Sequence, residues 1–214
     1  MAGADVVVVG GGVVGCAVAY ELARAGARAV VLERDQVASG ASSAAAGMLV
    51  PLAEVHAPGP FFDFCLAGLR RFDAVVEELR AESGVEVEYV RSGLLKVAFT
   101  AEQEAELRAA LTWQQARGLA VTWLDRQDAL ALEPKVSEEV RGALFTTEGG
   151  HVNAERLTQA LAQAAARKGA MVLQGKAVVG FVVEGSRVVG VRLPDEVWSA
   201  DHVVVAAGAW TAEA

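Results

Sequence analysis

The sequence predicts an α/β protein that opens with a Rossmann-like dinucleotide-binding fold, and three observations at its start support this. Residues 5–9 consist of Asp5 followed by four valines, as expected of a parallel strand buried on both faces. The glycine-rich run 10–15 follows directly, and residues 16–25 are typical of a helix that ends at Gly26. Residues 29–33 form a second apolar strand, so the chain begins with a βαβ unit.

The remaining elements follow from apolar periodicity and turn residues. Helices are expected at 61–83, at 101–117 after the N-cap Thr100, at 126–132, and from the N-cap Asn153 to about 168. Strands are expected at 85–89, 94–99, 121–124, 140–146 and 171–173. An antiparallel meander is expected at 178–183, 188–193 and 197–200, followed by a last buried strand at 202–206.

The composition excludes several kinds of binding partner and indicates the cellular compartment. The net charge is −8 and the pI is about 5.0, so the surface repels phosphates, and neither nucleic acid nor a membrane is expected as a partner. The apolar stretch 6–20 contains the glycine loop and is shorter than the ~20 residues of a membrane span. This stretch also lacks the basic start of a signal peptide, so the protein is expected to be cytoplasmic. Cys16 and Cys65 are expected to be buried thiols in a reducing compartment. The three histidines lack metal-ligand spacing, so no metal site is expected.

The glycine loop fits the GxGxxG pattern between a strand and a helix, and each glycine has a physical task there. Gly10 allows a tight turn, Gly12 lets the backbone approach a pyrophosphate, and Gly15 lets the helix pack closely on the sheet. The pyrophosphate then meets free N–H groups at the positive end of the helix dipole. Glu33 ends the second strand, where a carboxylate accepts hydrogen bonds from a ribose diol and disfavours the 2′-phosphate of NADP.

The loop alone does not separate FAD from NAD, but two further segments favour FAD. Residues 41–48 are small and carry hydroxyls, so this loop can pass close to the cofactor and donate hydrogen bonds to phosphate and ribitol. Residues 203–210, VVVAAGAW, follow the meander as a second strand of small residues that can close on the cofactor.

At these residues the sequence resembles the D-amino-acid oxidase-like FAD-dependent oxidoreductases, and among them most the glycine oxidases of thiamine biosynthesis. The resemblance covers essentially the whole chain, and its most specific piece is SSAAAGM at 42–48. It implies three parts: residues 1–84 as the first part of the FAD-binding domain, 85–147 as part of an antiparallel-sheet substrate domain, and 148–214 as the second part of the FAD-binding domain.

The resemblance also implies where the cofactor is held. The implied contacts are Gly10, Gly12, Val14 and Gly15 at the pyrophosphate, Glu33 at the adenosine ribose, Arg34 beside the adenine, Ser42 and Ser43 at phosphate and ribitol, Gly47 and Met48 near the isoalloxazine, Val178 at the adenine, and Ala206 and Gly208 near the pyrophosphate. Met48 is also a candidate substrate contact, with a core methionine under the flavin as the alternative. Residues 36–50 contain no His or Cys, so FAD is expected to be non-covalent.

The implied reaction is oxidation of a small amine such as glycine or sarcosine. Hydride passes from the substrate α-carbon to the flavin, the imine hydrolyses to a 2-oxo acid, and O₂ is reduced to H₂O₂. The alternatives are a D-amino-acid dehydrogenase with another electron acceptor, and an FAD-binding module without turnover. Family members run well beyond this length and supply a substrate-binding arginine and tyrosine later, so we expect a truncated chain whose parent forms homo-oligomers.

Overall fold

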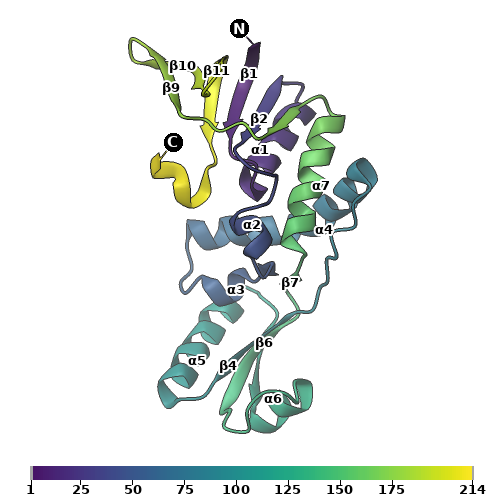
Figure 1. Ribbon diagram of the computed structural model, residues 1–214. Helices are drawn as coiled ribbons and strands as arrows, with labels where there is room; N and C mark the ends of the chain where they lie inside the picture. Colours follow the sequence, from purple (N-terminus) through teal and green to yellow (C-terminus); the bar gives the residue numbers. More distant parts are fainter. Residues whose placement is uncertain (1, 214) are drawn as a thin grey trace. The chain divides into compact units, whose positions relative to one another are not determined.

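The computed structural model describes residues 2–213, with side chains described for 3–212 (Figure 1). The chain forms two compact units. The first unit contains the residues up to 46, 75–88 and those from 153 onwards, and the second contains Gly47–Ala74 and Tyr89–Val152. The segment 47–74 thus groups with the second unit, whereas the sequence-based division placed it with the first. The assignment of cofactor and substrate domains stays a prediction.

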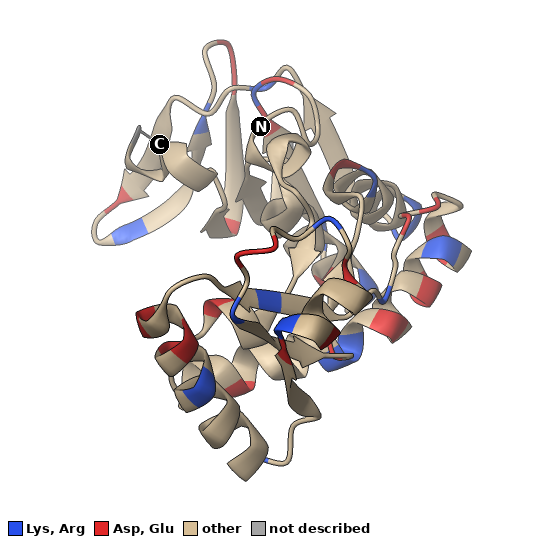
Figure 2. Ribbon diagram, turned by 90° about the horizontal axis from the view of Figure 1, so that it is seen from below, with Lys and Arg blue, Asp and Glu red and all other residues tan. Residues whose placement is uncertain are grey.

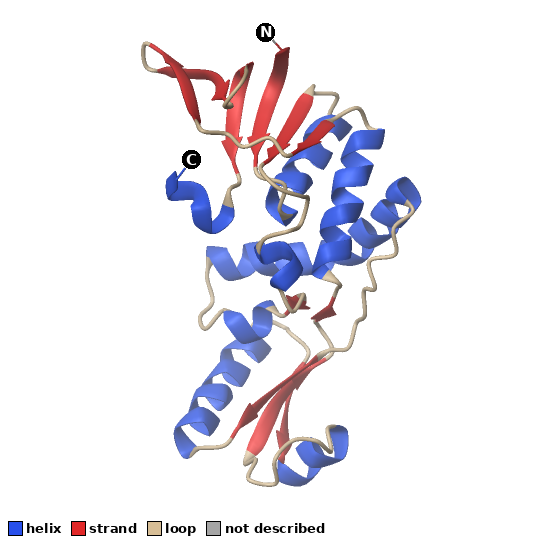
Figure 3. Ribbon diagram, viewed as in Figure 1, coloured by secondary structure: helices blue, strands red, loops and turns tan. Residues whose placement is uncertain are grey.

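The first unit is built on one six-stranded sheet of strand order β8-β2-β1-β11-β10-β9 (Figure 3). The parallel part consists of β8 (Met171–Gln174), β2 (Ala29–Glu33), β1 (Ala2–Val9) and β11 (Val197–Val205). The antiparallel part consists of β10 (Arg187–Arg192) and β9 (Gly180–Glu184). Val7, Val8, Val30 and Val31 are fully buried, which explains the unbroken valine runs, since a parallel strand is covered on both faces.

Helices α1 (Val13–Arg24) and α7 (Ala154–Arg167) pack against each other in this unit. Small residues make the contact possible, because Ala160, Ala164 and Ala165 of α7 and Ala19 of α1 are buried. A short helix, α2 (Ala41–Ala44), and a terminal 3₁₀ helix, η1 (Gly208–Glu213), complete the unit.

The second unit has its own three-stranded antiparallel sheet of order β4-β6-β5. Its strands are β4 (Leu94–Ala98), β6 (Gly142–Thr146) and β5 (Val121–Asp125), and its helices include α3 (Pro51–Glu54), α5 (Ala101–Ala116) and α6 (Arg126–Leu132). A two-stranded ladder pairs β3 (Met48–Leu49) with β7 (Gly150–His151). The hydrophobic core of this unit includes the fully buried Phe62, whose ring packs edge-on against Trp113.

The long helix α4 (Pro60–Ser83) contributes residues to both units. Within the first unit, Glu78 near its end pairs with Arg24 of α1 at 2.9 Å, and Glu82 pairs with Lys168 at 2.8 Å. Figure 2 shows acidic and basic positions interspersed on the helices, as in the pairs Arg80–Glu77 and Arg108–Glu104.

Three local predictions were wrong. Residues 85–89 form no strand, because Glu88 has a φ of +53° and breaks the extended run; the buried Val87 accepts a backbone bond from Asn153 instead. Helix α1 begins at Val13, inside the glycine loop, and not at Cys16. The strands expected at 197–200 and 202–206 are one strand, β11, whose first residues pair with β10 while residues between Trp198 and Val205 pair with β1.

Among residues 2–213, none of the helices combines the length and the apolar character that a membrane crossing requires. The same residues contain no cluster of His, Cys, Asp and Glu side chains arranged to hold a metal ion.

Candidate dinucleotide-binding site

The turn from β1 into α1 is tight, and two glycines make it possible. Gly10 has a φ of +110°, and a Cβ there would lie 2.5 Å from the carbonyl oxygen of Ala206. A Cβ on Gly15 would overlap the carbonyl oxygen of Gly10. The backbone bond from Ala206 N–H to Val9 O, at 2.8 Å, holds the end of β11 beside this turn. Both glycines are therefore required by packing within the protein, as their predicted tasks imply.

Gly12 differs from its neighbours, because protein packing does not explain it. Its backbone, with φ −78° and ψ 179°, suits any residue. Within the described chain a Cβ on Gly12 would come near a single atom, Ser42 Oγ, at 3.3 Å. A backbone that is left bare at a helix start, with room beyond it, fits a site where a pyrophosphate approaches the main chain.

The first turn of α1 is capped from a distance. The N-cap residue, Gly12, has no side chain that could cap the helix. Instead, Ser42 Oγ accepts a hydrogen bond from Val13 N–H at 2.9 Å. A first helical turn leaves further N–H groups without intrahelical partners, and their positive end attracts anions. Val14 is 62% exposed, so this end of the helix lies open to a ligand.

Glu33 is held at the end of β2 by two backbone donors. Its Oε2 accepts from Gly11 N–H at 2.6 Å and its Oε1 accepts from Asp35 N–H at 2.8 Å. Each carboxylate oxygen accepts more than one hydrogen bond, so a ribose diol can still be bound. The carboxylate is thus fixed in orientation beside the glycine loop.

Gly11 is a residue of this site that the sequence reasoning missed. Besides its bond to Glu33, its carbonyl accepts from Ala38 N–H at 3.1 Å, and a Cβ on it would lie 2.9 Å from that of Glu33. The signal was present in the sequence, since three glycines follow one another at 10–12 where the pattern requires only two of them.

The other predicted contacts of this unit surround the same loop or the strand ends beside it. The residue after Glu33, Arg34, lies with its guanidinium 4.4 Å from the ring centre of Trp210. Ser43 lies on α2 beside Ser42, and its hydroxyl donates to Gly40 O at 3.0 Å. Gly208 has a φ of +57° and opens η1. Lys176 N–H donates to Glu33 O at 2.8 Å, which brings the loop carrying Val178 to the end of β2.

Gly47 and Met48 belong to the second unit. A Cβ on Gly47, whose φ is +71°, would overlap the carbonyl oxygen of Val152, so this glycine has a packing requirement of its own. Met48 pairs with His151 in the short ladder and is 63% exposed. Their places near a flavin ring stay predictions.

Cys16 lies directly under the loop, and its thiol is chemically quiet. The side chain is fully buried and its Sγ donates to Gly11 O at 3.5 Å. Burial, and secondarily the charge of Glu33, raises the pKa of the Cys16 thiol to about 12. A thiol of that pKa stays protonated near neutral pH, so Cys16 is not a nucleophile.

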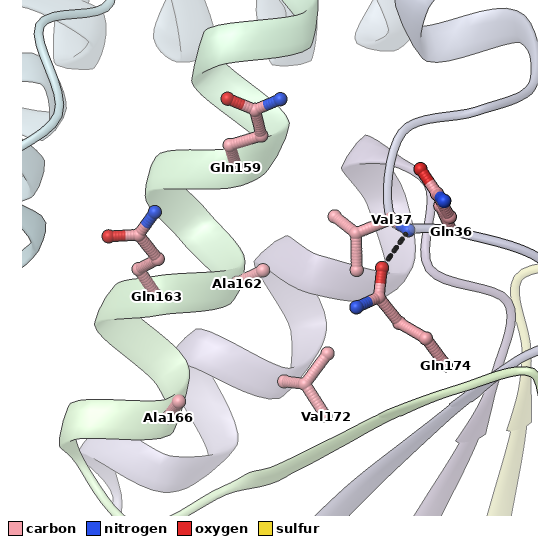
Figure 4. Close-up of a pocket in the computed structure, with 8 residues that line it drawn as sticks. All are labelled: Gln36, Val37, Gln159, Ala162, Gln163, Ala166, Val172 and Gln174. Atoms are coloured by element: carbon pink, nitrogen blue, oxygen red, sulfur yellow. Dashed lines mark hydrogen bonds between the residues drawn. The ribbon is translucent and has the colours of Figure 1, made fainter.

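A shallow hollow in the first unit lies beside the end of β2, where Gln174 pairs with Glu33 (Figure 4). Its polar rim consists of amides, with Gln174 Oε1 accepting from Val37 N–H at 2.7 Å, and its floor is apolar. It is lined by Gln36, Val37, Gln159, Ala162, Gln163, Ala166, Val172 and Gln174. None of these side chains carries a charge, and none belongs to the predicted cofactor contacts.

Comparison with known proteins identifies the family. The model of the family described as FAD dependent oxidoreductase (DAO) matches residues 5–214. The chain belongs to this FAD-dependent oxidoreductase family. Membership confirms the predicted family and its cofactor class, FAD, and the bare glycine loop with its fixed carboxylate fits that cofactor.

The similar members of the family include glycine oxidases. The chain is 37% identical to glycine oxidase of Geobacillus kaustophilus, over 97% of this chain and 55% of that protein. It is 35% identical to the bifunctional protein ThiO/ThiG of Synechocystis sp., over 98% of this chain and 30% of that protein. The crystal structure of glycine oxidase from Geobacillus kaustophilus superposes with a TM-score of 0.95 over 100% of this chain and 57% of that one, which confirms the predicted fold class. The chain spans about half the length of the glycine oxidases that it matches.

Proposed function

We propose that this chain binds FAD non-covalently and serves a cytoplasmic flavoenzyme that oxidises a small amine such as glycine or sarcosine. The observation that carries the proposal is the surroundings of Gly12. Its backbone needs no glycine and its Cβ position is nearly empty, yet it lies between a helix start and the fixed carboxylate of Glu33. A dinucleotide explains why a side chain is excluded there.

The residues of the loop divide the work of binding. The first-turn N–H groups of α1, together with Ser42 and Ser43, would meet the phosphates, where backbone donors and the helix dipole favour negative charge. Glu33 would hold the adenosine ribose, and Val178, at the loop after β8, would border the adenine. Ala206 and Gly208 would keep the end of β11 close to the pyrophosphate.

The family and the similarity to glycine oxidases support the proposed substrate chemistry. Bound FAD would supply the hydride-acceptor chemistry for oxidation of the amine at its α-carbon and the transfer of electrons to O₂. The contribution of this chain is to bind and orient the cofactor. Similarity at 37% identity to glycine oxidase of Geobacillus kaustophilus favours glycine or sarcosine over larger amines.

The test is the visible absorption spectrum of the purified, desalted chain. Oxidised-flavin bands that leave the protein on mild denaturation would support non-covalent FAD. Addition of glycine or sarcosine under anaerobic conditions should then bleach the bands if the chain is also competent in the reaction. A colourless protein that takes up no added FAD would overturn the proposal for this chain.

A further inference from the structure

Trp210 and Arg34 form a stack beside the glycine loop, although they are 176 positions apart in the chain. The guanidinium carbon lies 4.4 Å from the centre of the indole ring, within the range of a cation–π contact. Both side chains keep part of their surface open, with the Arg34 side chain 48% exposed and Trp210 38% exposed. The stack is therefore neither buried core nor fully solvated surface.

The position of Trp210 is set by the turn that follows β11. The backbone N–H of Trp210 donates to Ala207 O at 3.1 Å, and Thr211 Oγ1 donates to Gly208 O at 2.8 Å, which closes the 3₁₀ turn of η1. The indole reaches Gly40, where a Cβ would lie 3.5 Å from the ring. Gly40 immediately precedes α2, the helix that carries Ser42. The indole thus spans from the strand end to the loop between Glu33 and the phosphate-side serine.

Arg34 is steered towards this position by its neighbours. Both oxygens of Glu33 are engaged by backbone N–H groups, and the charge partner of Arg34 is Asp35, whose Oδ2 lies 3.3 Å from its Nε. A side chain as long as arginine loses rotamer freedom when it is held, and the indole restricts its planar group.

We propose that Trp210 is a positioning residue for adenosine binding: it holds the Arg34 guanidinium as a flat platform on which the adenine of the dinucleotide stacks. The inference rests on the proposed function. Because Glu33 would hold the adenosine ribose, the side chain of the adjacent residue Arg34 would border the attached base. Nucleobases stack on guanidinium planes as they do on aromatic rings, so a guanidinium held flat is a ready surface for adenine.

The experiment measures dissociation constants for three ligands that contain different parts of the dinucleotide. FMN lacks the adenosine, ADP-ribose lacks the flavin, and FAD contains both. An exposed cation–π contact corresponds to about a two- to fivefold change in affinity. Trp210→Leu should therefore weaken FAD and ADP-ribose by about two- to fivefold and leave FMN unchanged. Trp210→Phe should restore most of the loss because it keeps an aromatic face.

The double variant Trp210→Leu/Arg34→Met tests whether the two side chains affect FAD affinity together or independently. If Trp210 acts through Arg34, the double variant should bind FAD no more weakly than Arg34→Met alone. Arg108→Met is the matched control, because Arg108 stacks on Trp123 at 4.1 Å in the second unit and should leave all three affinities unchanged. Urea unfolding of each variant identifies any loss that comes from misfolding.

The outcomes separate the two proposals. A wild-type chain that binds neither FAD nor ADP-ribose refutes the proposed function. A wild-type chain that binds FAD, with variants that bind it equally well or with additive losses in the double variant, refutes the role of Trp210 alone. Equal weakening of FMN and FAD by Trp210→Leu also refutes it, since the effect would then lie outside the adenosine.

Discussion

Helix α1 of the first unit and helix α5 of the second unit begin in opposite ways. Helix α5 is capped by its own residues: Thr100 accepts from Gln103 N–H, and the Gln103 side chain accepts from Thr100 N–H. Helix α1 starts at Gly12, which has no side chain, and Val13 N–H donates a hydrogen bond to the hydroxyl of Ser42, 29 positions later. The capping box satisfies first-turn N–H groups of α5 locally. A helix start kept free of its own cap is available to an anion.

The glycines of the two units show the same contrast. In the second unit, a Cβ on Gly150 would overlap Val90 O and a Cβ on Gly142 would overlap the indole of Trp123, so protein atoms account for both. In the first unit Gly10 and Gly15 are explained in the same way, and Gly12 is not. Gly12 indicates a ligand because it combines this lack of a packing requirement with a place at the start of α1, next to the residue that binds Glu33.

The largest expected effect is on stability, at glycines that contact protein atoms. Gly15→Ala in the first unit and Gly47→Ala in the second should each lower the free energy of unfolding by about 3 kcal/mol, because the added methyl group overlaps a carbonyl oxygen. Urea denaturation measures this. Gly68→Ala is the control, since it lies in α4 with nothing within 4 Å of its Cβ position and should be neutral or slightly stabilising. Two variants as stable as wild type would show that the turns relax freely.

Gly12→Ala should separate binding from stability. The free energy of unfolding should change by less than about 1 kcal/mol, because the backbone is in an ordinary conformation and Ser42 Oγ is the one atom that must yield. The affinity for FAD should fall about tenfold or more, since the methyl group occupies the space for the pyrophosphate. Titration of the apoprotein with FAD, followed by flavin fluorescence, measures this. Undiminished affinity would remove the main support for a dinucleotide at this loop.

The two helix starts can be compared directly by removing their hydroxyl caps. Thr100→Ala should destabilise the protein by about 1 kcal/mol and leave FAD affinity unchanged. Ser42→Ala should cost a similar amount of stability through the lost bond to Val13, and should also weaken FAD about fivefold. Unfolding curves and FAD titrations of both variants give the comparison. Equal FAD affinity in the two would mean that Ser42 caps α1 and does nothing more.

Sequence patterns were sufficient where local chemistry decides the structure. Strand β2 and helix α6 have the predicted bounds, and Thr100 and Asn153 are the N-caps. The family followed from the residues of the loop and of the segment 42–48, because a glycine spacing and a small-residue loop are specified by neighbouring positions.

The failures lie where long-range contacts decide. The stretch 197–206 was predicted as two strands, but strand β11 continues past the exposed Asp201 while pairing with β1. The stretch 85–89 had strand-like alternation, and its bonding depends on Asn153, more than sixty positions later. The ladder of β3 with β7 is two residues long and has no periodic signal. The stack of Arg34 on Trp210 is likewise invisible in any local pattern.

The smallest expected effect concerns the two thiols, one in each unit. The buried Cys16 has a pKa raised from 9.0 to about 12 by burial, so it stays protonated in the folded chain while the unfolded chain ionises above pH 9. The raised folded value means that stability falls as the pH rises from 9 towards 12, with a loss of about 0.4 kcal/mol already at pH 9. Between pH 7 and pH 9, the free energy of unfolding measured with urea should therefore decline slightly less for Cys16→Ala than for wild type. Cys65→Ala, at a half-buried site, is the matched control. Rapid labelling of both thiols in the native protein would contradict the burial of Cys16 and, with it, the close packing of α1 under the glycine loop.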